Sequence, residues 1–439
     1  MRISKRYAVM GALLALVPSV HAQPNDLQTA YLRVVETHPA VTRSEFEIAR
    51  QSARVDIAAS VLKPQFELSA TENRVEQETL ASESSFNGQT HRATASQAIV
   101  DLERWENLKR EQTLVNSLAM SLENVKERLA LQLTERYVNV IRAQSRLNAI
   151  DELVESLEKR RSQAIEMNRL GQLSRLDLLR VQSRLAERRA EYSDAKSAVD
   201  TARAALLEID PEIKVDGAVS PQAVRVDWPD VLDRSTLLGS MLNNHPEVAA
   251  LEKQIEAEQF GLRAIERRRL PRLGLSASYE ESNIGSNNRQ ISDTNTTVFA
   301  LTLTVPLYRG GALGAEQAEQ AARVGQLETD REATKRFLVR SLDEAIARFA
   351  NARSAATTEA ENVRGQLESV NVLEQAYERG AVSQSELLDA LDNLANAKIS
   401  RDQVILNGLL GWVTVRVLSG QFQPSDLSQV DAVAAQYQG

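Results

Sequence analysis

The apolar positions of the longest uninterrupted segment recur at helical spacing. Residues 101–170 contain neither proline nor glycine and are rich in Glu, Arg, Leu, Gln and Ala, which favour helix. Apolar residues recur every seven positions with one eleven-residue step: Leu108, Val115, Leu122, Leu129, Val140, Leu147 and Val154. We predict one helix of about 105 Å at ~1.5 Å per residue, packed in a coiled coil whose winding changes midway.

Four shorter segments alternate apolar and polar residues, which is typical of strands with one apolar and one polar face. We predict strands over about 65–78, 91–100, 272–283 and 295–305, of which the second is the least regular. The polar segments 78–90 and 282–295 are expected to be the loops that connect each pair.

The two strand pairs belong to two copies of one unit. Three motifs return in the same order 207, 207 and 209 positions later: Thr37-His38-Pro39 as Asn244-His245-Pro246, Pro64 to Ala70 as Pro271 to Ala277, and Gly171-x-x-Ser174 as Gly380-x-x-Ser383. Each copy is expected to run helix, two strands, long helix, glycine turn, helix. We predict a first repeat over 23–209, a linker over 210–230, a second repeat over 231–419 and a tail over 420–439.

The first 22 residues have the pattern of a secretory signal peptide. Basic residues precede the apolar segment 7–17, and Val20-His21-Ala22 provides a small-residue cleavage site. No cysteine follows that site, so the new N-terminus is expected to carry no lipid. No later run approaches 18 apolar residues, so we expect an exported chain without an inner-membrane helix.

An exported chain with strands of this kind fits an outer-membrane β-barrel. The alternative is an edge sheet on a soluble protein, but the hairpins interrupt coiled-coil helices and no layer is left to cover their apolar faces. Four strands cannot close a barrel, because the smallest such barrels have about eight. We therefore predict that several chains share one barrel, whose number of chains the strand count leaves open.

Composition removes most other functions. The 439 residues include 4 His and no Cys, and the formal net charge is −8. These values exclude a disulfide scaffold and a thiolate site, and they give no support to nucleic-acid binding. His38 and His245 precede proline at equivalent repeat positions, where we expect a helix-turn role. We predict no catalytic, cofactor or metal site.

The sequence resembles the TolC-type outer membrane efflux proteins. The resemblance is carried by the duplicated order, by Ser96 to Asp101 followed by Trp105, and by Val305-Pro306-Leu307-Tyr308-Arg309-Gly310-Gly311. It implies a mainly α fold with a transmembrane β part: a homotrimer whose 12-stranded barrel in outer-membrane lipid continues as a 12-helix α-barrel tunnel across the periplasm. It also implies an exit duct that works with a periplasmic adaptor (membrane fusion protein) and an inner-membrane ABC or RND-type transporter.

The resemblance places a gate beyond the glycine turns. It implies that Glu386 and Asp389 form two acidic rings at the aperture, and that Asp177 and Tyr377 form a latch between neighbouring helices. If the resemblance is set aside, Glu386 and Asp389 are expected to be solvated surface acids. Tyr377 is then expected only to pack against its neighbours and Asp177 to cap the helix after Gly171. The turns 169–174 and 379–383 are expected to meet the adaptor through six residues: Leu170, Gly171, Gln172, Gly380, Ala381 and Val382.

One departure from the family pattern affects the gate. Val382 stands where the protein-exporting prototype has an arginine in a second latch. The closed state is then either less constrained or held by other residues, such as Arg175 or Arg379.

Three functions remain open. An exit duct for type I protein secretion is favoured slightly, because many dedicated drug-efflux ducts are acylated and this chain lacks the required cysteine. A dedicated small-molecule or drug efflux duct is the second. A non-conducting periplasmic coiled-coil scaffold, with incidental strands, is the third and belongs to a different class.

Overall fold

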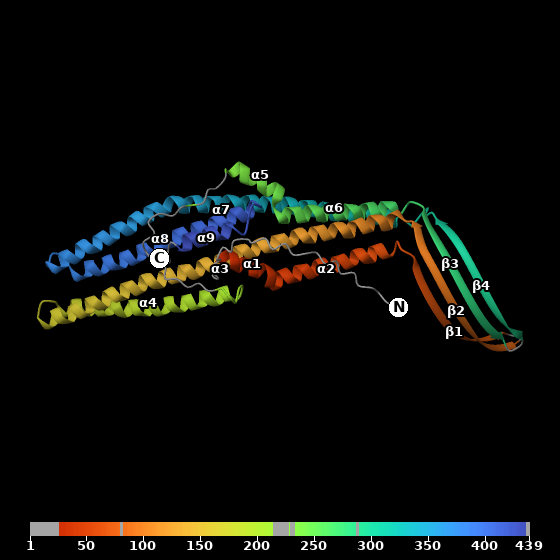
Figure 1. The fold of residues 1–439 in the computed structure, drawn as a ribbon, viewed down its shortest axis with the longest axis horizontal. Coiled ribbons are helices and arrows are strands. Elements are labelled where there is room, and N and C mark those ends of the chain that lie inside the picture. The colour runs from red at the N-terminus through yellow and green to blue at the C-terminus, as the bar shows by residue number, and fades with distance from the viewer. Residues whose placement is uncertain (1–25, 80–81, 214–227, 229–232, 287–288, 436–439) are drawn as a thin grey trace, which may run out of the picture.

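The computed structural model is an elongated molecule with strands at one end and two helical turns at the other (Figure 1). It describes residues 26–79, 82–213, 228, 233–286 and 289–435. The expected signal peptide and most of the expected linker lie outside the described residues. Two helices, α3 and α7, run almost the whole distance between the strands and the turns (Figure 1).

Both repeats have the same element order. The first contains α1 (Leu27–Thr37), α2 (Pro39–Ser60), β1 (Gln65–Thr79), β2 (Ser82–Val100), α3 (Leu102–Arg169) and α4 (Arg175–Leu207). The second contains α5 (Arg234–Asn244), α6 (Pro246–Arg267), β3 (Arg272–Ser286), β4 (Arg289–Thr304), α7 (Ala312–Glu378) and α8 (Gln384–Leu418), and α9 (Asp426–Ala435) follows. The long helix expected over 101–170 is α3.

The His-Pro motif divides the first helix of each repeat in two. His38 and His245 have extended backbones, and each Nδ1 accepts a hydrogen bond from a backbone N–H two residues later, at 3.2 Å. The proline occupies the first helical position, where its missing N–H costs nothing. The expected helix-turn role of both histidines is confirmed.

The strands form one antiparallel sheet in the order β1-β2-β3-β4. They are longer than the alternation predicts, and the loops expected over 78–90 and 282–295 are wrong: β2 begins at Ser82 and β4 at Arg289. These extensions are rich in Ser, Thr, Asn and Gln. They pair because the ladder of backbone hydrogen bonds needs no apolar side chains, so the period-two signal stops before the strand does.

The two faces of the sheet differ in chemistry. The register places Phe66, Ala95, Ala277 and Phe299 in one cross-strand row. Large apolar side chains on this face are exposed: Phe66, Leu68, Leu275, Phe299, Leu301 and Leu303. On the polar face, Arg92 pairs with Glu280 across β2 and β3 at 2.5 Å. The single chain therefore has an uncovered apolar face and two open edges, at β1 and β4.

The helix α3 changes partners along its length. Towards the strands it packs on α2 and α6, and towards the turns it packs on α4 and α8. Of the expected seam residues, Leu108, Leu129 and Val140 are buried, and the others are half-buried: Val115, Leu122, Leu147 and Val154. The eleven-residue step thus leads to a buried position. Beyond it, the buried leucines are Leu153 and Leu157, which the predicted pattern does not include, and α3 packs there on α4 and α8 instead of α2 and α6.

The main core lies midway along the molecule, where the ends of the described chain meet. Leu27 of α1 and Leu427 of α9 are fully buried there, in one cluster with Leu133 of α3 and Leu406 of α8. Asp431 of α9 accepts a hydrogen bond from the Leu27 backbone N–H at 2.7 Å. Burial, followed by the neighbouring carboxylate of Asp26, raises the pKa of Asp431 to about 8. Within the described ranges, no helix is both long and apolar enough to cross a membrane.

Candidate functional site

The two helical turns have the same backbone geometry. Gly171 and Gly380 adopt positive φ angles of 74° and 71°. After each glycine, a backbone N–H returns to a carbonyl five residues earlier: Gln172 donates to Met167 at 2.8 Å and Ala381 to Ala376 at 2.9 Å. This is the Schellman arrangement, which favours glycine because other residues are strained at positive φ. Duplication of the Gly-x-x-Ser motif therefore reproduces one turn twice.

The helices after the turns begin with equivalent caps. Ser174 Oγ accepts a hydrogen bond from the Asp177 N–H at 3.1 Å and donates one to the Asp177 carboxylate at 2.7 Å. Ser383 Oγ accepts from the Glu386 N–H at 3.3 Å, and the Ser383 N–H donates to the Glu386 carboxylate at 3.0 Å. The second arrangement is a complete capping box, whereas in the first the Asp177 carboxylate accepts from the Ser174 hydroxyl. Asp177 and Glu386 thus have a structural role at the start of α4 and α8.

The residues expected to meet an adaptor lie at the surface. Val382 is half-buried, and the other five residues are exposed: Leu170, Gly171, Gln172, Gly380 and Ala381. In addition, Leu176 and Leu179 on α4 are 59% and 49% exposed. The first turn therefore has an exposed apolar surface beside it, and the six residues expected from the sequence do not include these two leucines.

Tyr377 and Asp177 do not hydrogen-bond to each other in the described part of the chain. The Tyr377 hydroxyl lies 4.0 Å from the Met167 sulfur, and the Arg160 guanidinium lies 5.9 Å from the ring centre. Burial raises the pKa of Tyr377, the charge of Arg160 opposes the rise, and the charge of Asp177 adds to it. The Asp177 carboxylate instead forms an ion pair with Arg180 at 3.3 Å and accepts a hydrogen bond from the Ser174 hydroxyl at 2.7 Å. In one chain the two residues have the packing and capping roles, and the latch stays a prediction.

Glu386 and Asp389 are both exposed on the first turns of α8. Glu386 is engaged in its capping box, whereas the Asp389 carboxylate accepts a hydrogen bond from Arg184 of α4 at 3.1 Å. The structure therefore places both acids beside the second turn. Asp389 is joined by its ion pair to the helical hairpin that α3 and α4 form, whereas both acids belong to the helical hairpin of α7 and α8.

Arg184 belongs to an ion-pair network that the sequence did not reveal. The buried carboxylate of Asp392 accepts from Arg184 at 2.6 Å and from Arg188 at 3.1 Å. Arg184 thus bridges Asp389 and Asp392, one helical turn apart on α8. The signal in the sequence is a pair of arginines four apart on α4 and a pair of aspartates three apart on α8. Nothing in the sequence shows that these pairs face each other.

The network continues back to α3. Glu191 pairs with Arg188 at 2.5 Å and with Arg146 of α3 at 3.1 Å. Burial alone would raise the pKa of Glu191, but the two guanidinium groups outweigh it and lower the pKa below its ordinary value. One network of ion pairs therefore joins α3 and α4 of the first helical hairpin to α8 of the second.

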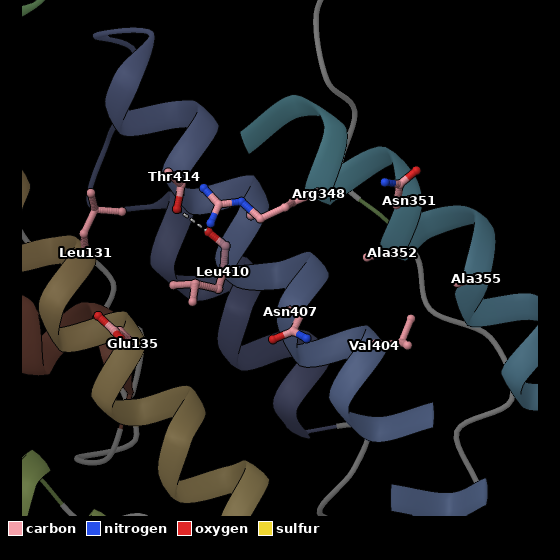
Figure 2. Close-up of a pocket in the computed structure, with 11 residues that line it drawn as sticks. Leu131, Glu135, Arg348, Asn351, Ala352, Ala355, Val404, Asn407, Leu410 and Thr414 are labelled. Carbon is pink, nitrogen blue, oxygen red and sulfur yellow. Dashed lines mark hydrogen bonds between the residues drawn. The ribbon is translucent and has the colours of Figure 1, made fainter. Parts of the chain in front are cut away.

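A groove of about 650 Å³ lies between α3, α7 and α8, near the middle of the molecule. Figure 2 shows Glu135 on α3, Arg348 and Asn351 on α7 and Asn407 on α8 around it. The Thr414 hydroxyl donates to the Leu410 carbonyl at 2.7 Å inside its own helix (Figure 2). The charged and amide groups come from three helices and do not converge on one point. Among the described residues, no three or more His, Cys, Asp or Glu are placed to hold a metal ion.

Comparison with known sequences gives one family. Residues 237–420, nearly the whole second repeat, match the model of the outer membrane efflux protein family. The chain is 20% identical over 420 residues to the outer membrane protein TolC of Escherichia coli, covering 92% of this chain and 84% of TolC. It is 21% identical over 439 residues to the proteases secretion protein PrtF of Dickeya chrysanthemi, covering 98% and 95%.

Solved structures share the fold. The structure of CusC superposes with a TM-score of 0.78 at 13% identity, over 90% of this chain and 92% of CusC. The outer membrane protein VceC of Vibrio cholerae gives 0.77 at 11% identity, over 90% and 96%. Residues 237–420 thus belong to the outer membrane efflux protein family, and the relatives and the fold shared over nearly the whole chain support the TolC-type outer membrane channels, which are not enzymes and which lie in the outer membrane and extend into the periplasm.

Proposed function

We propose that three copies of this chain form an exit duct for a tripartite export system. The observation that carries the proposal is the four-stranded sheet with open edges and an exposed apolar face, mounted on helices of 68 and 67 residues. Three copies would supply 12 strands, enough to close a barrel with its apolar face towards lipid. Four long helices per copy would supply a 12-helix tunnel below it.

The free surfaces of the chain support ring closure. The helices near the strands follow each other side by side in the order α2, α3, α6, α7. Phe46 and Ile57 on α2 and Phe337 on α7 are exposed, and they lie on the two outer helices of this row. In a ring, α2 of one copy would meet α7 of the next, and β1 would meet β4. The same closure would cover all of these groups.

The turns at the other end would receive the periplasmic adaptor, which in turn would contact an inner-membrane ABC or RND-type transporter. Exposed backbone and side chains at both turns provide this surface, together with Leu176 and Leu179. Glu386 and Asp389, on one face of α8, would form stacked acidic rings at the aperture and favour cations.

Protein secretion is the favoured cargo class. PrtF is named as a proteases secretion protein and the relative AprF of Pseudomonas aeruginosa as an alkaline protease secretion protein. The absence of cysteine agrees with a non-acylated duct. Small-molecule efflux is the alternative, since the relative BepC of Brucella suis is named as an efflux protein.

Four experiments test the proposal: bilayer recording, cross-linking, cell fractionation and gene deletion. Purified protein in planar bilayers is expected to conduct ions, and cross-linking is expected to stop at three chains. Recovery of unaggregated protein only in the soluble periplasmic fraction, without conductance, would instead favour the coiled-coil scaffold. Deletion of the gene, followed by comparison of secreted proteins and drug susceptibility, separates the two cargo classes: loss of a secreted protein with unchanged susceptibility indicates secretion.

A further inference from the structure

We propose that α2 receives α7 of a second copy in the register of the interface between α3 and α6, and that Arg50 and Arg54 of α2 pair there with Glu319 of that copy. The proposal rests on the proposed ring of three copies, in which α2 and α7 are the outer helices of the row (Figure 1). What the ring alone leaves open is the register of the two helices and the charges that select it.

The two repeats match in their side-chain contacts as well as in their sequence. Gln51 Nε2 of α2 donates to the carboxylate of Glu111 of α3 at 2.6 Å and to its carbonyl at 3.3 Å. Gln320 Nε2 of α7 donates to the carboxylate of Glu258 of α6 at 2.6 Å and to its carbonyl at 3.0 Å. Glu258 lies 207 positions after Gln51 and Gln320 lies 209 after Glu111, which are the offsets of the sequence motifs. Thus α6 corresponds to α2 and α7 to α3, residue by residue.

The interface between α3 and α6 is the template. Ser117 Oγ of α3 donates to the Ala250 carbonyl of α6 at 2.8 Å. Further along, Arg110 of α3 pairs with the buried carboxylate of Glu258 at 3.0 Å. A Cβ added to Gly261 would lie 3.4 Å from the Arg110 side chain, so the two helices are closely packed at this point. These contacts fix the register of α3 against α6.

The corresponding face of α2 is uncovered in one chain. On α6 this face consists of small buried residues at helical spacing: Ala250, Ala257, Gly261 and Ala264. On α2 the equivalent positions are exposed and larger: Arg43, Arg50, Arg54 and Ile57. Ala264 is 2% exposed, whereas Ile57 is 65% exposed. The face of α6 that meets α3 therefore corresponds to an open face on α2.

The template register brings opposite charges together. By the two offsets, the approach of Arg110 to Gly261 becomes an approach of Glu319 of α7 to Arg54 of α2. Arg50 lies one helical turn from Arg54 on the same face. All three of these charged side chains are exposed, and none has an ion-pair partner in the part of the chain that the structure describes. Docking between copies would give each of them a partner.

The same charges exclude the wrong partner for each helix. If α3 of another copy docked on α2, Arg110 would lie against Arg54. If α7 of another copy docked on α6 in place of α3, Glu319 would lie against Glu258. Like charges across an interface suppress wrong partners. Two interfaces with one backbone geometry are therefore kept apart by an exchange of charge, which fixes the order of the helices in the ring.

The register is tested with disulfides, because the chain has no cysteine of its own. Gln326 and Arg43 occupy the positions of Ser117 and Ala250, so Gln326→Cys with Arg43→Cys is expected to give covalent trimers on non-reducing gels. Gln326→Cys with Arg54→Cys is the matched control. Its second cysteine lies 11 residues further along α2, about 16 Å away and beyond the reach of a disulfide. Covalent trimers from the control pair, or from neither pair, would overturn the register.

The charges are tested by reversal. Arg50→Glu with Arg54→Glu is expected to lower the yield of trimers extracted from outer membranes at least tenfold. Addition of Glu319→Arg is expected to restore most of that yield, because the opposite charges then face each other again. Glu328→Arg is the control for this rescue: it puts the same charge on α7 two residues beyond Gln326, on another face of the helix, and should restore nothing.

The outcomes separate the pairing from the ring. A trimer yield that the reversal leaves unchanged, or that Glu328→Arg restores equally, would overturn the pairing of Glu319 with Arg50 and Arg54. A chain that forms no trimers without any substitution would overturn the proposed duct itself. Rescue by Glu319→Arg alone, together with covalent trimers from the first cysteine pair, is the expected result.

Discussion

The two turns of the molecule share a backbone and differ in surroundings. Both have the same glycine conformation and the same serine cap. Yet 19 of the 35 residues of α8 are buried, against 5 of the 33 residues of α4. The reason is that α8 packs on α3, α7 and α9, whereas α4 packs mainly on α3. Duplication copied the local structure, and divergence made the helix after the second turn a buried element and the helix after the first turn an exposed one.

The difference suits two tasks. An exposed turn and helix with Leu170, Leu176 and Leu179 at the surface suit contact with another protein. A helix fixed by buried contacts, with Asp392 bound by two arginines, suits a structural part of the wall.

The largest expected effect follows removal of the buried carboxylate. Asp392→Ala is expected to destabilise the turn end by about 1.5–3 kcal/mol, because two partly buried arginines each lose one of their two carboxylate partners. Asp177→Ala, which removes an exposed cap, is expected to cost about 1 kcal/mol. Amide hydrogen exchange of α4 and α8 in the purified trimer measures both. Equal exchange in the two variants would show that the hairpins are held alike.

The exposed leucines provide the second effect. Leu176→Ser with Leu179→Ser is expected to weaken partner binding roughly tenfold or more, because each leucine buried on binding contributes about 1.5–3 kcal/mol. Thermal stability should not change. Cross-linking in living cells, followed by identification of attached periplasmic proteins, measures the binding, and Leu207→Ser, at a similarly exposed leucine at the other end of α4, is the control. Undiminished cross-linking in the leucine variant would remove α4 from the contact surface.

The glycines should give a smaller and equal effect. Gly171→Ala and Gly380→Ala are each expected to cost about 1–2 kcal/mol, since the left-handed conformation is strained for alanine. No side chain or backbone lies within 4 Å of the added carbon at either position, so only strain contributes. Hydrogen exchange at the two turns compares them. A much larger loss at one turn would mean that the two backbones are not equivalent.

A further effect concerns pH, which should act oppositely on the stability of the turn end and of the middle of the molecule. The folded pKa of Asp431 is raised to about 8, so its stabilising effect is complete below its unfolded pKa near 4 and is lost as pH rises to about 8. The folded pKa of Glu191 is lowered, so its contribution is present above its unfolded pKa and is lost as pH falls through the folded value.

The thermal stability of the native protein is expected to decline between pH 5 and about 8 because Asp431 loses its proton. In Asp431→Asn, this decline is expected to be absent. Hydrogen exchange of α1 and α9 localises the effect, and Glu191→Gln serves as the comparison at the turn end. An unchanged pH profile in Asp431→Asn would contradict a neutral buried carboxyl at this position.

The sequence by itself determined the features that depend on neighbouring residues. Periodicity located α3, glycine and serine spacing located the turns and caps, and the His-Pro motif located the breaks at His38 and His245. These signals work because backbone conformation is set within about one turn of helix or one strand.

Only the tertiary structure decided which side chains meet. The second half of the α3 seam, the pairing of the polar strand segments and the contacts of Arg184 and Arg188 all depend on elements far away in the chain. The arginines and Asp392 are separated by 208 and 204 positions. Charged residues at helical spacing are ordinarily solvated, and only the approach of α8 to α4 brings Arg184, Arg188 and Asp389 together around the buried carboxylate of Asp392.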